Sequence, residues 1–190
     1  QSGESTEKET RKHTNVTMWQ FETIIEDFGN KNNVWGGHVI VDDEVVNEIK
    51  SLKIKRLVCT LNDKEKFHCA LQSMGNGTYF VMVNKDLQKK LRVTKGSKIQ
   101  VKLEKDTSKY GMPMPEEMAE ILAQDPEIDK IFHAMTPGKQ RSLLYLIGKP
   151  RRTESRIKKA VLISRYLVSV NGNLDFREMN EYIKANNNLF

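Results

Sequence analysis

VIVDDEV at residues 39–45 recurs 42 positions later as VMVNKDL at residues 81–87, and the correspondence continues without a gap. Each copy has the pattern of a strand, a short helix and a second strand, with Asp42 and Asn84 at the N-cap position of the helix. The second strand alternates apolar and polar residues, as a sheet with one buried face requires. Beyond the quoted stretch, the corresponding apolar pairs are Ile49 and Leu91, Leu57 and Ile99, Cys59 and Val101, and Leu61 and Leu103.

Two similar units, each with a half-buried sheet, bury their apolar faces best against each other. The repeat therefore predicts a compact β-barrel with pseudo-two-fold symmetry. An N-terminal strand from Met18 to Glu26 and a hairpin that carries Cys59 and Cys69 complete the predicted barrel.

The segment Asn62-Asp63-Lys64-Glu65 is typical of a hairpin turn. Centring this hairpin near Lys64 predicts three cross-strand pairs, which are Leu61 with Phe67, Cys59 with Cys69, and Leu57 with Leu71. We interpret the two cysteines as buried thiols. A disulfide between them is geometrically allowed but is disfavoured in a reducing compartment, and without further ligands nearby a zinc site has little support.

The second half of the chain is helical. A Pro/Gly-containing linker at residues 110–115 marks the change in composition, and proline or N-cap residues mark the helix starts that follow. Residues 160–168 are apolar on several faces, which predicts a helix buried between its neighbours. The predicted boundaries are starts at Glu116, Pro126, Pro137, Thr153 and the Asp175 cap, with Gly148 closing the third helix and Val168 near the end of the fourth.

The positive charge is concentrated in one stretch. Residues 137–166 contain nine Lys or Arg and one acidic residue, Glu154, so the stretch carries +8 in a chain whose net charge is +6. Cations at a helix N-terminus oppose the helix dipole, so they are poorly explained as a stabilising device. Two interpretations stay open: an anion-binding surface, or a solvated basic face paired with nearby acids. The anion-binding candidates are Lys149, Arg151, Arg152, Arg156 and Lys159, and we expect charge reversal at Arg152 and Arg156 to leave folding intact.

No motif for catalysis, a metal or a cofactor stands out. The four histidines are scattered, no glycine-rich phosphate loop is present, and Gly75-Asn76-Gly77 is better interpreted as a turn. We therefore expect a protein that is not an enzyme and that holds neither a cofactor nor a metal ion.

The sequence also resembles known families. VCTLN (58–62), GTY (77–79), NKDL (84–87) and VTKGS (93–97) resemble a bacterial domain of unknown function, whose fold is a double-split β-barrel, AbrB-like in shape. The second half resembles the YdeI/OmpD-associated, bacteriocin-protection-type region in PEE (115–117), Phe132, LLYLI (143–147), Lys149 and Arg156-Ile157. This resemblance spans about residues 18–185 and implies no catalytic residues. The family has a Thr-Arg pair shortly before its Arg-Ile, whereas this chain has Arg152-Thr153.

These observations predict an α+β protein in which a pseudo-two-fold barrel at residues 18–109 follows a disordered tail at 1–17, and an all-helical region at 116–190 follows the linker. We expect a cytoplasmic, non-enzymatic binding or regulatory protein whose basic helical region engages an anionic partner, such as nucleic acid or a phosphorylated or acidic partner. The alternative, implied by the resemblance, is a stress or bacteriocin-tolerance protein that acts through protein–protein contacts. No membrane segment is expected.

Overall fold

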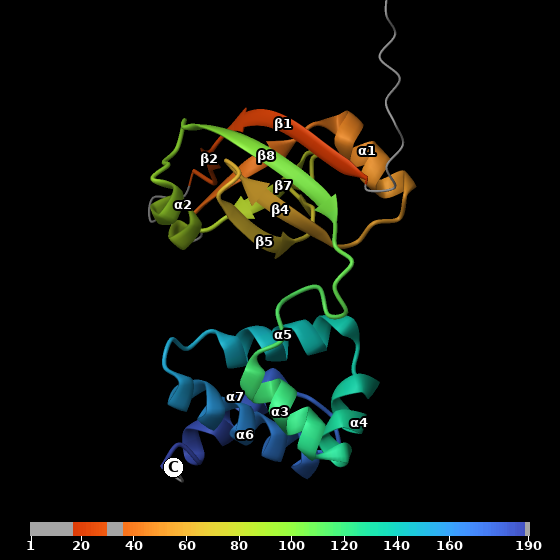
Figure 1. Cartoon of the computed structure of the whole chain (residues 1–190), viewed down its shortest axis with the longest axis vertical. Coiled ribbons are helices and arrows are strands. Elements are labelled where there is room, and N and C mark those ends of the chain that lie inside the picture. Colours follow the sequence, from red (N-terminus) through yellow and green to blue (C-terminus); the bar gives the residue numbers. More distant parts are fainter. Residues whose placement is uncertain (1–16, 30–35, 189–190) are drawn as a thin grey trace, which may run out of the picture. The chain divides into compact units, whose positions relative to one another are not determined.

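The computed structural model describes residues 17–29 and 36–188, and the chain divides into two compact units, Gln1–Asp106 and Thr107–Phe190 (Figure 1). Most of the predicted tail, residues 1–16, lies outside the described part. The predicted linker belongs physically to the second unit, because Tyr110, Met112 and Met114 pack against its core. None of the helices within the described residues combines the length and the apolarity needed to cross a bilayer.

The first unit contains two open four-stranded sheets around one apolar core. One sheet has the strand order β1-β8-β4-β5 and the other β2-β3-β7-β6. The α+β class is confirmed, but the strands described here form two open sheets rather than the closed barrel that was predicted. The elements are β1 (Met18–Ile24), β2 (Glu26–Asp27), β3 (Gly37–Val41), α1 (Asp43–Ser51), β4 (Leu57–Leu61), β5 (Glu65–Cys69), β6 (Gln72–Ser73), β7 (Tyr79–Val83), α2 (Lys85–Leu91) and β8 (Lys98–Lys105).

The internal repeat determines how these strands pair. Each copy forms a strand, a helix and a strand, as predicted, and each strand of the first copy pairs antiparallel with its counterpart in the second copy. Val39 lies opposite Val81, and Thr60 lies opposite Lys102, so residues 42 positions apart face each other in both sheets. An antiparallel pair places equivalent residues opposite each other only around a local two-fold axis, which supports the predicted pseudo-symmetry.

The predicted hairpin register is wrong by two residues. Cys59 lies opposite Phe67, and Leu57 lies opposite Cys69. The tight turn is centred one residue earlier than predicted, because Asn62 and Asp63 both adopt left-handed backbone angles and the Lys64 N–H donates to the Leu61 carbonyl at 3.0 Å. A shift of two residues keeps every side chain on its predicted face.

The two cysteines remain close despite the changed register. Both are free thiols, with Cys59 buried and Cys69 half-buried. A hydrogen bond with Cys69, together with burial, raises the pKa of the Cys59 thiol far above its usual range. The Cys59 thiol is therefore a protonated core group.

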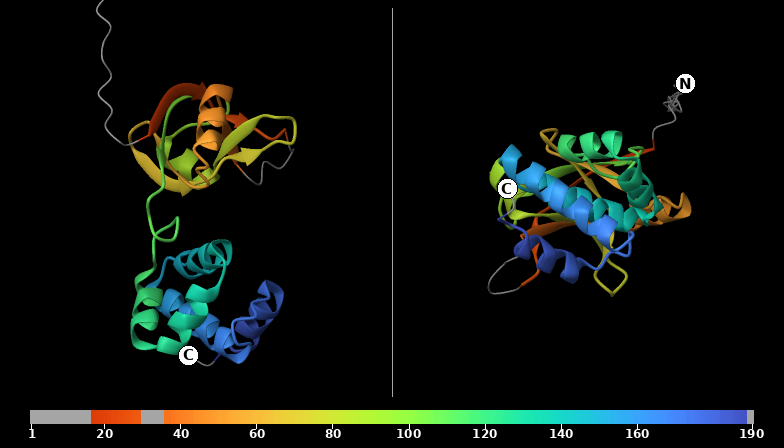
Figure 2. Two further views of the ribbon diagram at one scale, coloured as in Figure 1. Left: turned by 90° about the vertical axis from the view of Figure 1, so that its right-hand side faces the viewer. Right: turned by 90° about the horizontal axis from the view of Figure 1, so that it is seen from below.

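The second unit is a bundle of five helices within the described residues: α3 (Glu116–Gln124), α4 (Pro126–Ala134), α5 (Pro137–Gly148), α6 (Thr153–Ser169) and α7 (Phe176–Ala185). The predicted helix starts are confirmed, and side chains of Asp125, Thr136 and Asp175 accept hydrogen bonds from the first backbone N–H groups of α4, α5 and α7. Each of the other four helices contacts α6 (Figures 1 and 2). Its buried residues include Ala160, Ile163 and Leu167, as the apolar pattern predicted.

The repeat provides a matched pair of helix caps for a stability test. The Asn84 side chain accepts a hydrogen bond from the Leu87 N–H at 2.9 Å, whereas Asp42, at the equivalent position, makes no side-chain cap bond. We expect Asn84→Ala to lower the free energy of unfolding of the first unit by about 1 kcal/mol. Asp42→Ala should lower it by less than about 0.5 kcal/mol. Urea unfolding followed by tryptophan fluorescence measures this, because Trp19 is buried in the core of the first unit and the sequence of the second unit contains no tryptophan. Equal losses in the two variants would contradict the assignment of the cap.

Candidate anion-binding surface

The five predicted cations lie around the α5–α6 connection. Lys149 is the C-cap of α5, Arg151 lies in the connection, and Arg152 is the N-cap of α6. Arg156 and Lys159 follow in the first two turns of α6. Lys149, Arg151 and Arg152 are exposed, whereas Arg156 and Lys159 are half-buried. All five candidates thus lie in the α5–α6 connection or in the first two turns of α6, and Arg156 and Lys159 are the less exposed among them.

Arg156 already has its partners within the protein. Its Nε donates to Glu117 Oε1 at 2.7 Å, and the Glu117 side chain is only 8% exposed. One terminal nitrogen donates to the carbonyls of Pro150, at 3.4 Å, and Arg151, at 3.0 Å. The other donates to Thr153 Oγ1 at 3.1 Å. The Arg156 guanidinium thus ties the first turn of α3 to the α5–α6 connection and to the start of α6.

This network changes the role expected of Arg156. A guanidinium with a buried carboxylate and three further acceptors has little free capacity for an external anion. The expectation that charge reversal at Arg156 leaves folding intact does not fit these contacts, because reversal would place two carboxylates together in a partly buried site. Glu117 had no signal in the sequence, since a pair 39 residues apart follows no helical spacing.

The other four candidate cations have no acidic partner in the described part of the chain. Within residues 17–29 and 36–188, no carboxylate lies within ion-pair distance of Lys149, Arg151, Arg152 or Lys159. Lys149 Nζ lies 5.8 Å from the centre of the Tyr145 ring, which leaves its charge exposed to solvent. Arg152 gives α6 no side-chain cap, so the N–H groups of its first turn add partial positive charge.

An apolar pocket adjoins these cations. Its volume is about 500 Å³. Its apolar lining comes from Met112, Pro113, Met114, Pro115, Leu144 and Tyr145. The charged residues Glu117, Lys149 and Arg156 also line it. Tyr145 is 55% exposed, so part of its ring is accessible at this pocket. The surface therefore combines cations with an apolar recess, and the recess was not predicted from the sequence.

Comparison with protein families assigns both units. Residues 21–103 match the domain of unknown function DUF1905. Residues 112–163 match the family described as Bacteriocin-protection, YdeI or OmpD-Associated (OmdA). The chain is a DUF1905 domain followed by an OmdA domain. The OmdA match contains all five candidate cations and ends within α6, so the last part of α6 and all of α7 lie beyond it. Neither the curated proteins nor the solved structures that were compared gave a match to the chain.

The described residues offer no comparable site for a metal ion, because no three His, Cys, Asp or Glu side chains among them are grouped to hold one. One titratable group of the DUF1905 domain, His38, is almost fully buried, at 2% exposed. Its ring stacks on Phe28, with centroids 4.3 Å apart, and meets Phe80 edge-on. Burial lowers the pKa of His38, and the carboxylates of Glu26 and Asp27 oppose this effect only in part. His38 is therefore a neutral aromatic core residue of this domain.

The arginine network generates a paired prediction. We expect Arg156→Ala to lower the free energy of unfolding of the OmdA domain by about 2–3 kcal/mol, because it leaves the buried Glu117 carboxylate without its partner. Arg152→Ala removes the same charge from an exposed side chain and should cost less than about 0.5 kcal/mol. Urea unfolding followed by circular dichroism at 222 nm, together with hydrogen exchange of the first turn of α6, measures both. Similar losses of unfolding free energy in the two variants would show that the contacts of Arg156 do not stabilise the domain.

The buried histidine generates a prediction about pH. Since the folded pKa of His38 lies below its ordinary value of 6.5, the unfolded chain takes up the proton more readily. We expect the stability of the DUF1905 domain to be constant above about pH 7 and to fall as the pH drops below about 6.5. His38→Phe, which keeps a ring beside Phe28, should remove this part of the dependence. Tryptophan fluorescence during urea unfolding at pH 5.5 and 7.5 tests it, and an identical pH dependence in the variant would contradict it.

Proposed function

We propose that this chain is a non-enzymatic binding or regulatory protein whose OmdA domain engages an anionic partner through Lys149, Arg151, Arg152 and Lys159. The observation that carries the proposal is the concentration of these cations around one helix–helix connection, without acidic partners among the described residues. Like charges this close repel one another and reduce stability, so the fold itself gains nothing from their proximity. A bound anion would offset that repulsion.

The Arg156 network supports the proposal through preorganisation. Arg156 donates hydrogen bonds to the Pro150 and Arg151 carbonyls, so the backbone that carries Arg151 and Arg152 is fixed before any partner arrives. A fixed backbone lowers the entropy cost of binding, which then falls mainly on the long side chains. Arg156 is in this account a positioning residue, and Glu117 holds it in place.

The chemistry favours phosphate groups as the partner's anions. Arginine presents a planar set of donors that matches phosphate oxygens, and Arg151 and Arg152 are adjacent and exposed. The uncapped N–H groups at the start of α6 add donors of the same kind. Nucleic acid and phosphorylated protein segments both carry such groups. We place the protein in the cytoplasm, where the neighbouring free thiols of Cys59 and Cys69 stay reduced.

A second candidate function is docking of an acidic protein segment, as in a bacteriocin-tolerance role. It is favoured by the apolar recess that Met112, Met114 and Leu144 form beside Lys149, and by the exposed Tyr145 ring. An apolar anchor in the recess and acidic residues against the cations would use both features. The description of the OmdA family is consistent with this candidate.

Salt dependence tests the first candidate. We expect the full chain to bind a fluorescein-labelled 16-base-pair duplex DNA, with log Kd rising linearly with log salt between 50 and 200 mM. The triple variant Lys149→Gln/Arg151→Gln/Arg152→Gln should weaken binding at least tenfold and lower the salt slope by about 2–3. A matched triple variant, Lys130→Gln/Arg141→Gln/Lys184→Gln, changes the net charge equally and should leave most of the affinity. Fluorescence anisotropy measures all three proteins.

The same assay separates the two candidates. Absence of duplex binding at 50 mM salt, or equal losses in the two triple variants, would contradict the phosphate-binding proposal. Binding of an acidic peptide that is lost on Tyr145→Ala and changes little with salt would favour docking of a protein segment instead.

A further inference from the structure

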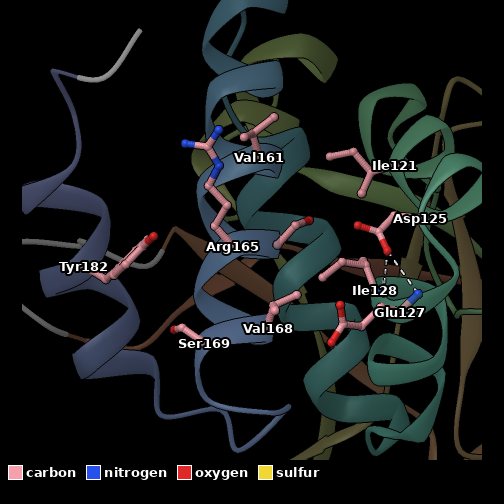
Figure 3. Close-up of a pocket in the computed structure, with 10 residues that line it drawn as sticks. Ile121, Asp125, Glu127, Ile128, Val161, Arg165, Val168, Ser169 and Tyr182 are labelled. Carbon is pink, nitrogen blue, oxygen red and sulfur yellow. Dashed lines mark hydrogen bonds between the residues drawn. The ribbon is translucent and has the colours of Figure 1, made fainter.

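A second pocket of about 500 Å³ lies in the helical unit, between the α3–α4 region and α6. Figure 3 shows Val161 and Val168 of α6 facing Ile121 and Ile128 across this pocket. Such a volume, with a surface that is more apolar than polar and a few polar groups, is typical of small-molecule sites. Half of the lining lies beyond the OmdA match, namely Ser164, Arg165, Val168, Ser169 and Tyr182.

One buried polar group in the pocket lacks a partner. Ser164 is 6% exposed and lines the pocket, and its Oγ has no hydrogen-bond partner among the described residues. A buried hydroxyl without a partner destabilises the protein, so such groups are rare unless a ligand or function uses them. A ligand that reaches Ser164 would supply the missing hydrogen bond.

The charges of the lining indicate the class of ligand. Asp125 and Glu127 lie on the α4 side of the pocket, while the Arg165 guanidinium extends on the side of α6 away from them (Figure 3). Asp125 Oδ1 accepts from the N–H groups of Glu127, at 3.0 Å, and Ile128, at 3.2 Å. The second oxygen of this carboxylate has no partner in the described part of the chain, so it can accept from a cation.

We propose that this pocket binds a small amphiphilic amine, with its hydrocarbon body between the α3–α4 and α6 aliphatic side chains and its ammonium group at Asp125 and Ser164. An ammonium carries three N–H donors, which suit one carboxylate oxygen and one hydroxyl oxygen. A carboxylate ligand would meet Asp125 and Glu127 with the wrong sign. A neutral alcohol could bond Ser164 but would leave the charge of Asp125 unmatched.

Nuclear magnetic resonance of the ¹⁵N-labelled full chain at pH 7 tests the proposal with three probes of equal chain length: hexylamine, hexanol and hexanoate. We expect hexylamine to give saturable shifts of amides in residues 121–128 and 161–169. Hexanol should bind at least fivefold more weakly, and hexanoate should cause no saturable shift. Absence of saturable shifts with hexylamine, or equal binding of hexanoate or hexanol, would overturn the proposal.

Matched variants separate the pocket from general effects. Asp125→Asn keeps an N-cap side chain but removes the charge, and should weaken hexylamine binding at least fivefold. Asp175→Asn makes the same change at the cap of α7, outside the pocket, and should leave hexylamine binding unchanged. An equal loss in both variants would overturn the proposal. Lys149→Gln/Arg151→Gln/Arg152→Gln should also leave it unchanged, so failure of this inference and failure of the proposed function are distinguishable.

Replacing Ser164 should raise stability and lower the affinity for hexylamine. Ser164→Ala should raise the Tm of the ligand-free protein, because it removes a buried hydroxyl that lacks a partner, and should weaken hexylamine binding severalfold. A fall in Tm would show that the hydroxyl has a partner in the free protein, which would overturn the inference. Unchanged affinity for hexylamine in this variant would overturn it equally.

Discussion

The Arg156–Glu117 ion pair is the contact on which the α5–α6 connection of the helical unit depends. Without it the α5–α6 connection would lose three side-chain hydrogen bonds and its link to α3. Within the pair, the Glu117 side chain is almost fully buried. One arginine is thus used to hold the backbone, and that use leaves the neighbouring cations, Arg151 and Arg152, exposed to solvent. In the proposed function, structural and binding roles are therefore divided between arginines that look alike in the sequence.

That division explains what the sequence could and could not predict. Helix starts at Asp125, Thr136 and Asp175 were predictable because capping is local, with the decisive side chain within three residues of the N–H groups it accepts from. The pairing of Arg156 with Glu117 was not, because it depends on how α3 and α6 pack together. The pocket at Ser164 could not be predicted either, because it forms where α6 packs beside α3 and α4. A serine within an apolar helix indicates burial, but it does not indicate whether the hydroxyl has a hydrogen-bond partner.

The fold of the DUF1905 domain was predictable from the sequence only in part. The repeat at an offset of 42 residues predicted the strand–helix–strand units and their pseudo-two-fold relation, whereas the pairing of each strand with its counterpart was seen only in the structure. The predicted register of the hairpin between Leu61 and Glu65 was wrong, because two consecutive residues with left-handed backbone angles, Asn62 and Asp63, move the centre of the turn by one position. The arrangement of strands and helices therefore follows from the repeat, whereas the register of the hairpin follows from the backbone angles of two residues. A repeated apolar pattern indicates which residues face the core, but a shift of two residues leaves that pattern unchanged, so the pattern cannot fix the register.

The helical unit separates two surfaces of opposite character along α6. Its first turn carries cations and uncapped N–H groups, whereas the pocket near its other end has carboxylates from Asp125 and Glu127. The proposed anion and the proposed amine would therefore occupy distinct places on one helix and would not compete for the same side chains. Both proposed sites include residues of α6, the helix that contacts every other helix of the bundle in the described residues. The packed core residue Ile163 lies between Lys159 and Ser164 along α6, so coupling of the two proposed sites through packing would pass through it.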